Sequence, residues 1–232
     1  MSTFIRLALG VLLLLAGSWA QADEPVNDQP MSFAFCYEDR ELLPYYTGNG
    51  PEVPKSNPGS TIDAIKELDA RTPEIKVKLH REPWKRCLAM LKKGLTDGVI
   101  ASYKPEREKI GIYPKKDEAP DLARAFSITA YCLYTHDGSP LAWDGSNFSG
   151  KVEKDLAVPR GYSIITMLKQ HQLPFDEVDS TDQAFWMLYH QRVSGVVTLC
   201  EPGQQLLDSD PRYASISPNE PPLIVRGGFL LL

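Results

Sequence analysis

The sequence has few side chains that bind metals or carry redox chemistry. Its 232 residues include four cysteines and four histidines. No two cysteines form a C-x-x-C pair, so the common zinc and thioredoxin-like motifs are excluded. The histidines lie in separate segments, and no pair has the i, i+4 spacing of a helical metal site. The sequence therefore predicts no metal and no cofactor.

Clustered positive charge is also missing. The formal net charge is −5 at pH 7, and Lys and Arg are scattered apart from the short runs 92–93 and 115–116. Nucleic-acid-binding surfaces need concentrated basic residues, so nucleic acid is excluded as a partner. The apolar content of 43% favours a folded core over a disordered chain.

Long apolar runs are absent except at the N-terminus. Arg6 precedes the apolar segment 7–16, and the small residues of 20–22 (Ala-Gln-Ala) come just before Asp23. This order is typical of a secretory signal peptide, and the apolar core is shorter than the roughly 20 residues that a membrane anchor needs. We predict a signal peptide at 1–22 and a periplasmic mature protein. Asp23, in the position where a lipid anchor needs Cys, predicts no lipidation.

Strand and helix patterns alternate along the rest of the chain. Helices are expected after Ser60, which can cap the first of them, after Pro83, from Gly161 to about Gln172, and after Ser180, which with Gln183 resembles a capping box. Strands are expected at 31–36, 75–79, 99–101, 156–159, 175–178 and 196–199. Such alternation predicts mainly parallel sheets with ligands at the carboxyl ends of the strands.

The pattern divides into two α/β units. Residues 97–100 (DGVI) and 194–197 (SGVV) match, and each follows an amphipathic helix. The apolar segment 126–134 is expected to cross between the units. We predict a first lobe at 23–126, a second lobe at 127–222 and a strand at 223–232 that returns to the first lobe. Two facing α/β lobes form a cleft that can close on a ligand.

Several motifs occur in a particular order along the chain: 35–39 (FCYED) with 44–46 (PYY), 83–88 (PWKRCL), 94–98 (GLTDG), 105–107 (PER) and 159–163 (PRGYS). Taken together and in this order, they resemble the extracellular solute-binding proteins of family 3, the amino-acid-type receptors of ABC importers. The resemblance covers roughly residues 32–207.

The resemblance implies a type II periplasmic-binding fold, with two lobes, two crossover strands and a ligand at the hinge. It implies a monomer that binds a small solute, an amino acid or a related carboxylate. An ABC-transporter permease or a membrane sensor would then be the partner. Family members usually continue through further helices, whereas this chain ends at Leu232, so the return strand is expected to be truncated.

Arg107 is the principal candidate for ligand binding. It follows a buried strand, and a guanidinium can hold a carboxylate through two parallel hydrogen bonds. In the resembled family the arginine of the matching motif holds the α-carboxylate of the ligand. The alternative is that Arg107 pairs only with a surface acid. Ser102 can add a hydroxyl donor beside it.

Two further groups complete the predicted site. Gly161, Tyr162 and Ser163 lie at a strand-to-helix turn that favours an anion, and a helix cap without a ligand is an equal alternative. Tyr46 and Trp84 can stack on an apolar or cationic part of the ligand, although Trp84 equally fits the core. Glu38 can accept a hydrogen bond from an ammonium group, or it is an ordinary exposed acid.

Three positions depart from the family pattern. Lys104 stands where the amino-acid receptors usually have Thr or Ser for the carboxylate, and Leu199 stands where many have Asp for the α-amino group. Glu201 can substitute for that Asp only by a different approach. These departures weaken the expectation of α-amino-acid binding and leave anion capture in place.

Two other functions stay open at this point. One is an enzyme on the same fold, such as a dehydratase or lyase of small carboxylic acids, which would need Glu38 or Glu201 as an acid or base. We favour a binding protein over an enzyme because no triad, phosphate loop or metal motif is present. The other is a degenerate relative that binds nothing, suggested by the short C-terminus.

The cysteines suggest two pairs, with buried free thiols as the alternative. Cys36 ends the first strand, and Cys87 lies on the inner face of a helix that should cross it in a doubly wound sheet, so we predict a disulfide. The arrangement implied by the resemblance sets the crossover strand antiparallel to the strand that Cys200 closes. We therefore expect Cys132 and Cys200 to lie close together, with register deciding whether they bond.

Overall fold

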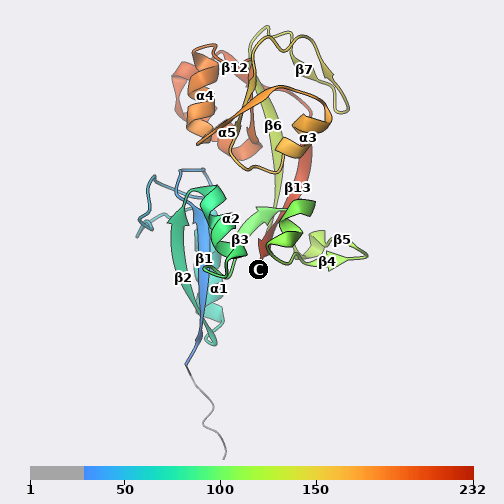
Figure 1. Cartoon of the computed structure of the whole chain (residues 1–232). Coiled ribbons are helices and arrows are strands. Elements are labelled where there is room, and N and C mark those ends of the chain that lie inside the picture. The colour runs from blue at the N-terminus through green and yellow to red at the C-terminus, as the bar shows by residue number, and fades with distance from the viewer. Residues whose placement is uncertain (1–28) are drawn as a thin grey trace, which may run out of the picture.

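The computed structural model describes residues 29–232, so the predicted signal peptide at 1–22 lies outside the described residues. The chain forms two α/β lobes connected by long strands, with the first lobe in blue and green and the second mostly in yellow and orange in Figure 1. No helix within residues 29–232 is long and apolar enough to cross a membrane.

The first lobe is built on short parallel strands. β1 (Met31–Glu38) pairs in parallel with β2 (Ile75–Glu82), and a single bridge from Phe35 to Gly98 connects β1 to the start of β3 (Val99–Ser102). The other elements of this lobe are α1 (Ser60–Arg71), α2 (Trp84–Lys92), η1 (Pro105–Lys109), β4 (Lys115–Lys116), β5 (Ala119–Pro120) and η2 (Leu122–Arg124).

The second lobe repeats this strand–helix pattern. β9 (Leu156–Pro159) lies between the parallel strands β10 (Phe175–Val178) and β11 (Gly195–Leu199). The helices are α3 (Ile165–Gln170), α4 (Thr181–Tyr189), α5 (Cys200–Ser209) and η3 (Pro211–Tyr213). The remaining strands are β7 (Ala142–Trp143), β8 (Phe148–Ser149) and β12 (Ile216–Pro218).

Two antiparallel crossover strands connect the lobes. β6 (Ser127–His136) runs into the second lobe, and β13 (Ile224–Leu231) returns to the first. They pair from Ile224 opposite Tyr131 to Gly228 opposite Ser127. The far part of β6 then pairs with β11, and the far part of β13 pairs with β3. A continuous sheet, β10-β9-β11-β6-β13-β3, therefore extends through both lobes.

Alternating side chains fill cores on both faces of these strands. On β9, Leu156 and Val158 belong to one apolar cluster, whereas Ala157 belongs to another. On β1, Phe35 packs in one cluster and Cys36 in a second. Two-sided burial explains why these strands appear in the sequence as continuous apolar runs rather than as alternating patterns.

Several local predictions need correction. Gly59, with φ of 100°, is the N-cap residue of α1, and Ser60 is helical with its hydroxyl donating to the carbonyl of Pro44. Leu68, three positions after the buried Ile65, is 49% exposed, although this spacing predicts that it shares the apolar face of the helix. Only α4 has the predicted cap, since Ser180 Oγ accepts from the Gln183 N–H while Gln183 accepts from the Asp179 N–H.

Both cysteine pairs form disulfides. Cys36 and Cys87, with Cα atoms 5.5 Å apart, connect β1 to α2 inside the first-lobe core. Cys132 and Cys200 have Cα atoms 5.0 Å apart. The residue directly opposite Cys132 is Thr198, and Cys200 follows two positions later as the first residue of α5 rather than the last of the strand. An offset of two keeps both cysteines on the same face of the sheet.

We expect each disulfide to stabilise the fold by closing a long loop, with sequence separations of 51 and 68 residues. Replacing Cys36 and Cys87 together by Ser should lower the free energy of unfolding by about 2–5 kcal/mol. Urea unfolding without reductant measures this value, and peptide mass spectrometry of the wild type verifies the pairing. An unchanged unfolding midpoint in the double variant would contradict the expectation.

Candidate functional site

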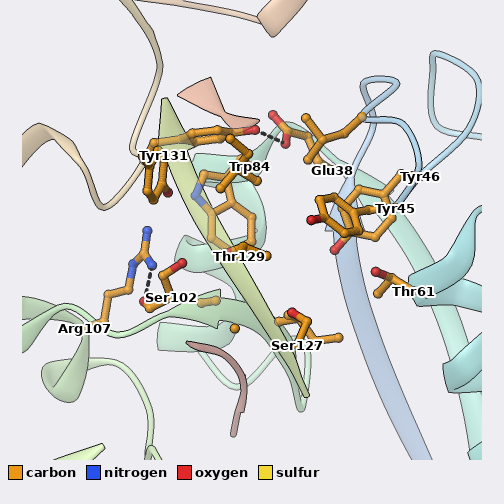
Figure 2. A pocket seen from close by; sticks show the side chains of 16 residues that line it. Glu38, Tyr45, Tyr46, Thr61, Trp84, Ser102, Arg107, Ser127, Thr129 and Tyr131 are labelled. Atoms are coloured by element: carbon orange, nitrogen blue, oxygen red, sulfur yellow. Dashed lines mark hydrogen bonds between the residues drawn. The ribbon is translucent and has the colours of Figure 1, made fainter. Parts of the chain in front are cut away.

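A cavity of about 90 Å³ lies between the lobes, against the crossover strands (Figure 2). The residues at the carboxyl ends of three strands line it: Glu38 on β1, Ser102 on β3 and Leu199 on β11. Ligands of open α/β sheets bind at this edge because loops and helix starts converge there. The other lining residues are Leu42, Tyr45, Tyr46, Thr61, Trp84, Ile100, Ala101, Arg107, Ser127, Thr129, Tyr131, Tyr162 and Gly228.

Arg107 is a buried cation without an acidic partner. It lies in η1 and is 5% exposed, yet it forms no salt bridge with any residue among 29–232. Its guanidinium donates to the carbonyl oxygens of Ser102 at 2.7 Å and Gly161 at 2.9 Å. It also lies 5.4 Å from the ring centroid of Trp84. The alternative of a surface ion pair is therefore wrong.

Arg81 shows how this fold holds a structural arginine. It is also buried, at 3% exposed, and donates to the carbonyl oxygens of Glu38, Gly48 and Glu52. These bonds surround the guanidinium and fix the loop after β1. Arg107 makes fewer such bonds and borders a cavity. With five N–H donors, Arg107 retains the capacity to bind an anion.

Glu38 is the acidic group of the cavity. It is 7% exposed, and its Oε2 accepts a hydrogen bond from the Tyr162 hydroxyl of the second lobe at 3.2 Å. Burial disfavours the charged form and raises the pKa of Glu38 to about 7, although the bond from Tyr162 opposes the shift. The alternative of an ordinary exposed acid is therefore wrong.

Hydroxyl groups and aromatic rings form much of the remaining wall. Burial raises the pKa of Tyr46 and Tyr162 well above the usual range, so both hydroxyls stay protonated at neutral pH and can donate. Trp84, the first residue of α2, lines the cavity and also packs against clusters of both lobes. Trp84 therefore packs with the cores and also borders the cavity, and its role in ligand binding stays a prediction.

Gly161 and Ser163 are the predicted site residues that the cavity wall does not include. The Gly161 N–H donates to Glu177 Oε2 at 2.9 Å, so a carboxylate of the protein already occupies this turn. Ser163 is 2% exposed and donates to the Tyr131 hydroxyl. The remaining six predicted residues, Glu38, Tyr46, Trp84, Ser102, Arg107 and Tyr162, all line the cavity.

The crossover strand β6 supplies three wall residues that sequence reasoning missed. Ser127, Thr129 and Tyr131 lie at every second position, which places them on the same face of the strand. Polar side chains at every second position of a segment that was expected to be apolar could have indicated that one face of this strand borders a cavity. Leu199, noted for its departure from the family pattern, also lines the cavity, whereas Lys104 and Glu201 do not.

Polar contacts hold the lobes together around the cavity. Arg107 of the first lobe bonds Gly161 of the second, and Tyr162 bonds Glu38. Lys85 on α2 forms a 3.0 Å salt bridge with Glu177 on β10. Burial opposes ionisation of Glu177, but hydrogen bonds from Lys85 and the Gly161 N–H outweigh it and lower its pKa. These three contacts join the two lobes on the sides of the cavity.

No protein-family model and no curated protein sequence matches the chain. The ligand-binding core of GluR0 from Nostoc punctiforme, in complex with L-glutamate, matches with a TM-score of 0.65 at 16% identity, over 88% of this chain and 84% of that chain. A histidine kinase sensor domain with similarity to periplasmic binding proteins gives 0.69 at 14% identity, over 88% and 83%.

The chain has a type II periplasmic-binding fold. The substrate-binding protein of an amino acid ABC transporter gives a TM-score of 0.65 at 15% identity, over 87% of this chain and 84% of that chain. At such identities the likeness establishes the fold, which confirms the predicted fold class.

Within residues 29–232, no cluster of three or more His, Cys, Asp or Glu side chains is placed to hold a metal ion.

The burial of Glu38 predicts how the stability of the fold depends on pH. The folded-state pKa of Glu38, about 7, lies above its ordinary value of 4.5. The fold is therefore destabilised progressively as pH rises through this interval, by on the order of 3 kcal/mol in total. Glu38→Gln removes the charge and should gain stability relative to the wild type between pH 4.5 and 8.

Urea unfolding at pH 4.5, 6 and 8 measures this difference. Glu74→Gln is the matched control, because it makes the same substitution at an exposed position. A constant difference between wild type and Glu38→Gln across this range would show that Glu38 is not desolvated.

Proposed function

We propose that this chain is a periplasmic solute-binding protein that holds a small carboxylate, an amino acid or a related acid, on Arg107 between its lobes. The observation that carries the proposal is the buried guanidinium of Arg107, which borders the cavity without an acidic partner among the described residues. A carboxylate there would form charge-assisted hydrogen bonds in a low-dielectric setting, where such bonds are strong.

The compartment and the partners belong to the same proposal. The predicted signal peptide and the disulfides suit an oxidising periplasm. The structural neighbours include a substrate-binding protein of an amino acid ABC transporter and a histidine kinase sensor domain. Delivery of the solute to an importer permease and presentation to a membrane sensor are both compatible with the fold. We propose a monomer because both walls of the cavity come from a single chain.

We propose binding without catalysis. Among the described residues that line the cavity, Glu38 is the carboxyl group, and none is His, Cys or Lys. Its Oε2 is hydrogen-bonded to Tyr162, so one of its two oxygens is already engaged. An enzyme acting on small carboxylic acids would consume them, whereas a binding protein returns them unchanged. Product analysis by NMR after prolonged incubation with bound carboxylates separates these functions.

The mature protein, residues 23–232, should gain thermal stability with at least some members of a panel of amino acids, polyamines and dicarboxylates, because ligands that bind the native state raise Tm. For the best carboxylate, Arg107→Ala should weaken binding by about 30-fold or more in calorimetry. Arg107→Lys keeps the charge but loses the planar fork, so it should restore affinity only partly.

Arg71→Ala is the matched control, since the Arg71 side chain is 75% exposed on α1. It should bind like the wild type. Unchanged affinity in a folded Arg107→Ala variant would overturn the assignment of Arg107. Failure of every carboxylate to raise Tm would overturn the proposed function.

A further inference from the structure

The cavity contains a single pair of formal charges, and they lie apart. Among the described lining residues, Arg107 is the cation and Glu38 is the acid. Figure 2 shows Arg107 and Tyr131 on one side of Trp84, and Glu38, Tyr45 and Tyr46 on the other. None of the salt bridges within residues 29–232 joins Arg107 to Glu38. The two charges are therefore separate binding points.

The wall around these points is neutral and largely apolar. Trp84 stands between the two charged groups in Figure 2, and Leu42, Tyr46 and Ile100 also line the cavity. Such a wall suits methylene groups, which gain free energy when they leave water. A ligand that reaches both charged groups therefore needs an apolar spacer between its own polar ends.

No acid of the second lobe lines the cavity. Leu199 lies opposite Tyr131 in the β11–β6 ladder, so the second lobe contributes an apolar side chain to the cavity wall at this position. Glu177 is bonded to Lys85 and the Gly161 N–H. Glu201 lies near Tyr45, where burial first and this carboxylate second raise the pKa of the tyrosine. A cation held close to Arg107 would have no counter-charge.

We propose that the ligand is an ω-amino carboxylate, with its carboxylate on Arg107, its terminal ammonium on Glu38 and no α-amino group. This inference rests on the proposed function and names its substrate class. Oε2 of Glu38 accepts from Tyr162, and Oε1 has no hydrogen-bond partner among residues 29–232, so Oε1 is the acceptor for the ammonium.

The physical basis is the cost of an unpaired buried charge. An α-ammonium lies two bonds from the carboxylate carbon, so a carboxylate on Arg107 would hold it near Arg107 and away from Glu38, the acid among the described lining residues. Burial there without a counter-charge is unfavourable. A terminal ammonium instead meets Glu38, a buried acid that forms no salt bridge within residues 29–232. Binding would supply a cationic partner.

The test is a thermodynamic cycle on the ligand, measured by calorimetry with the mature protein. A series from 3-aminopropanoate to 6-aminohexanoate first finds the best chain length. At that length, four ligands are compared: the ω-amino acid, the plain carboxylate, the α-amino acid and the α,ω-diamino acid. For five carbons these are 5-aminopentanoate, pentanoate, norvaline and ornithine.

We expect the ω-ammonium to strengthen binding and the α-ammonium to weaken it, each by about 10-fold or more. Glu38→Gln should abolish the gain in affinity that the ω-ammonium gives over pentanoate. Leu199→Asp should reverse the penalty for the α-ammonium, and Leu199→Met, an apolar control of similar volume, should preserve it. Unfolding curves verify that each variant folds.

The outcomes separate this inference from the function on which it rests. If norvaline or ornithine binds the wild type as tightly as its counterpart without the α-amino group, the inference is wrong and carboxylate binding stands. The same holds if the ω-ammonium gives no gain at any chain length. If no carboxylate binds, and Arg107→Ala changes nothing, the proposed function itself fails.

Discussion

The antiparallel pairing of β6 and β13 is the constraint on which the rest of the structure depends. This ladder, from Ile224 opposite Tyr131 to Gly228 opposite Ser127, connects the sheets of both lobes. Its register sends Ser127, Thr129 and Tyr131 into the cavity, while Cys132 faces the opposite side and bonds Cys200. A shift of one residue would exchange these faces and remove both the polar wall and the disulfide. The register of the β6–β13 ladder therefore determines three features together: the connection between the lobes, the residues of β6 that line the cavity, and the Cys132–Cys200 disulfide.

The two charged groups of the cavity, Arg107 and Glu38, are buried, and burial makes their hydrogen-bonding partners important. A guanidinium or a carboxyl group is rarely buried unless it is paired, because water solvates charge far better than protein does. Arg81 meets this requirement through carbonyl oxygens that also organise the loop after β1. Arg107 and Glu38 meet it less completely, and each bonds across the cleft, to Gly161 and to Tyr162 respectively. The contacts between the lobes thus satisfy part of the hydrogen-bonding capacity of each charged group, and both groups line the cavity.

Periodicity and chain order made the elements predictable. The strand at 156–159, the capping box at Ser180 and the helix after Pro83 all depend on local patterns, and the structure contains each of them. The site residues at strand ends could also be predicted, because a parallel sheet places the carboxyl ends of its strands, here Glu38 and Ser102, at the same edge. Gly161 and Ser163 do not line the cavity, and contacts with distant residues account for this: the Gly161 N–H donates to Glu177 on the neighbouring strand, and Ser163 donates to the Tyr131 hydroxyl. The prediction that Ser60 caps α1 was wrong. Gly59 is the N-cap residue, and its positive φ cannot be read from the helical periodicity of the sequence.

The sequence by itself determined the fold class, the alternation of strands and helices, and a set of side chains whose chemistry allows them to bind an anion. These depend on patterning within a few residues, or on motifs whose order along the chain is informative. Only the tertiary structure decided that Arg107 has no acidic partner among residues 29–232, that Glu38 is buried against Tyr162, and that Leu199 borders the cavity beside Tyr131. Burial and strand register are properties of contacts between segments far apart in the chain. The sequence constrains such contacts only through the complete packing of the fold.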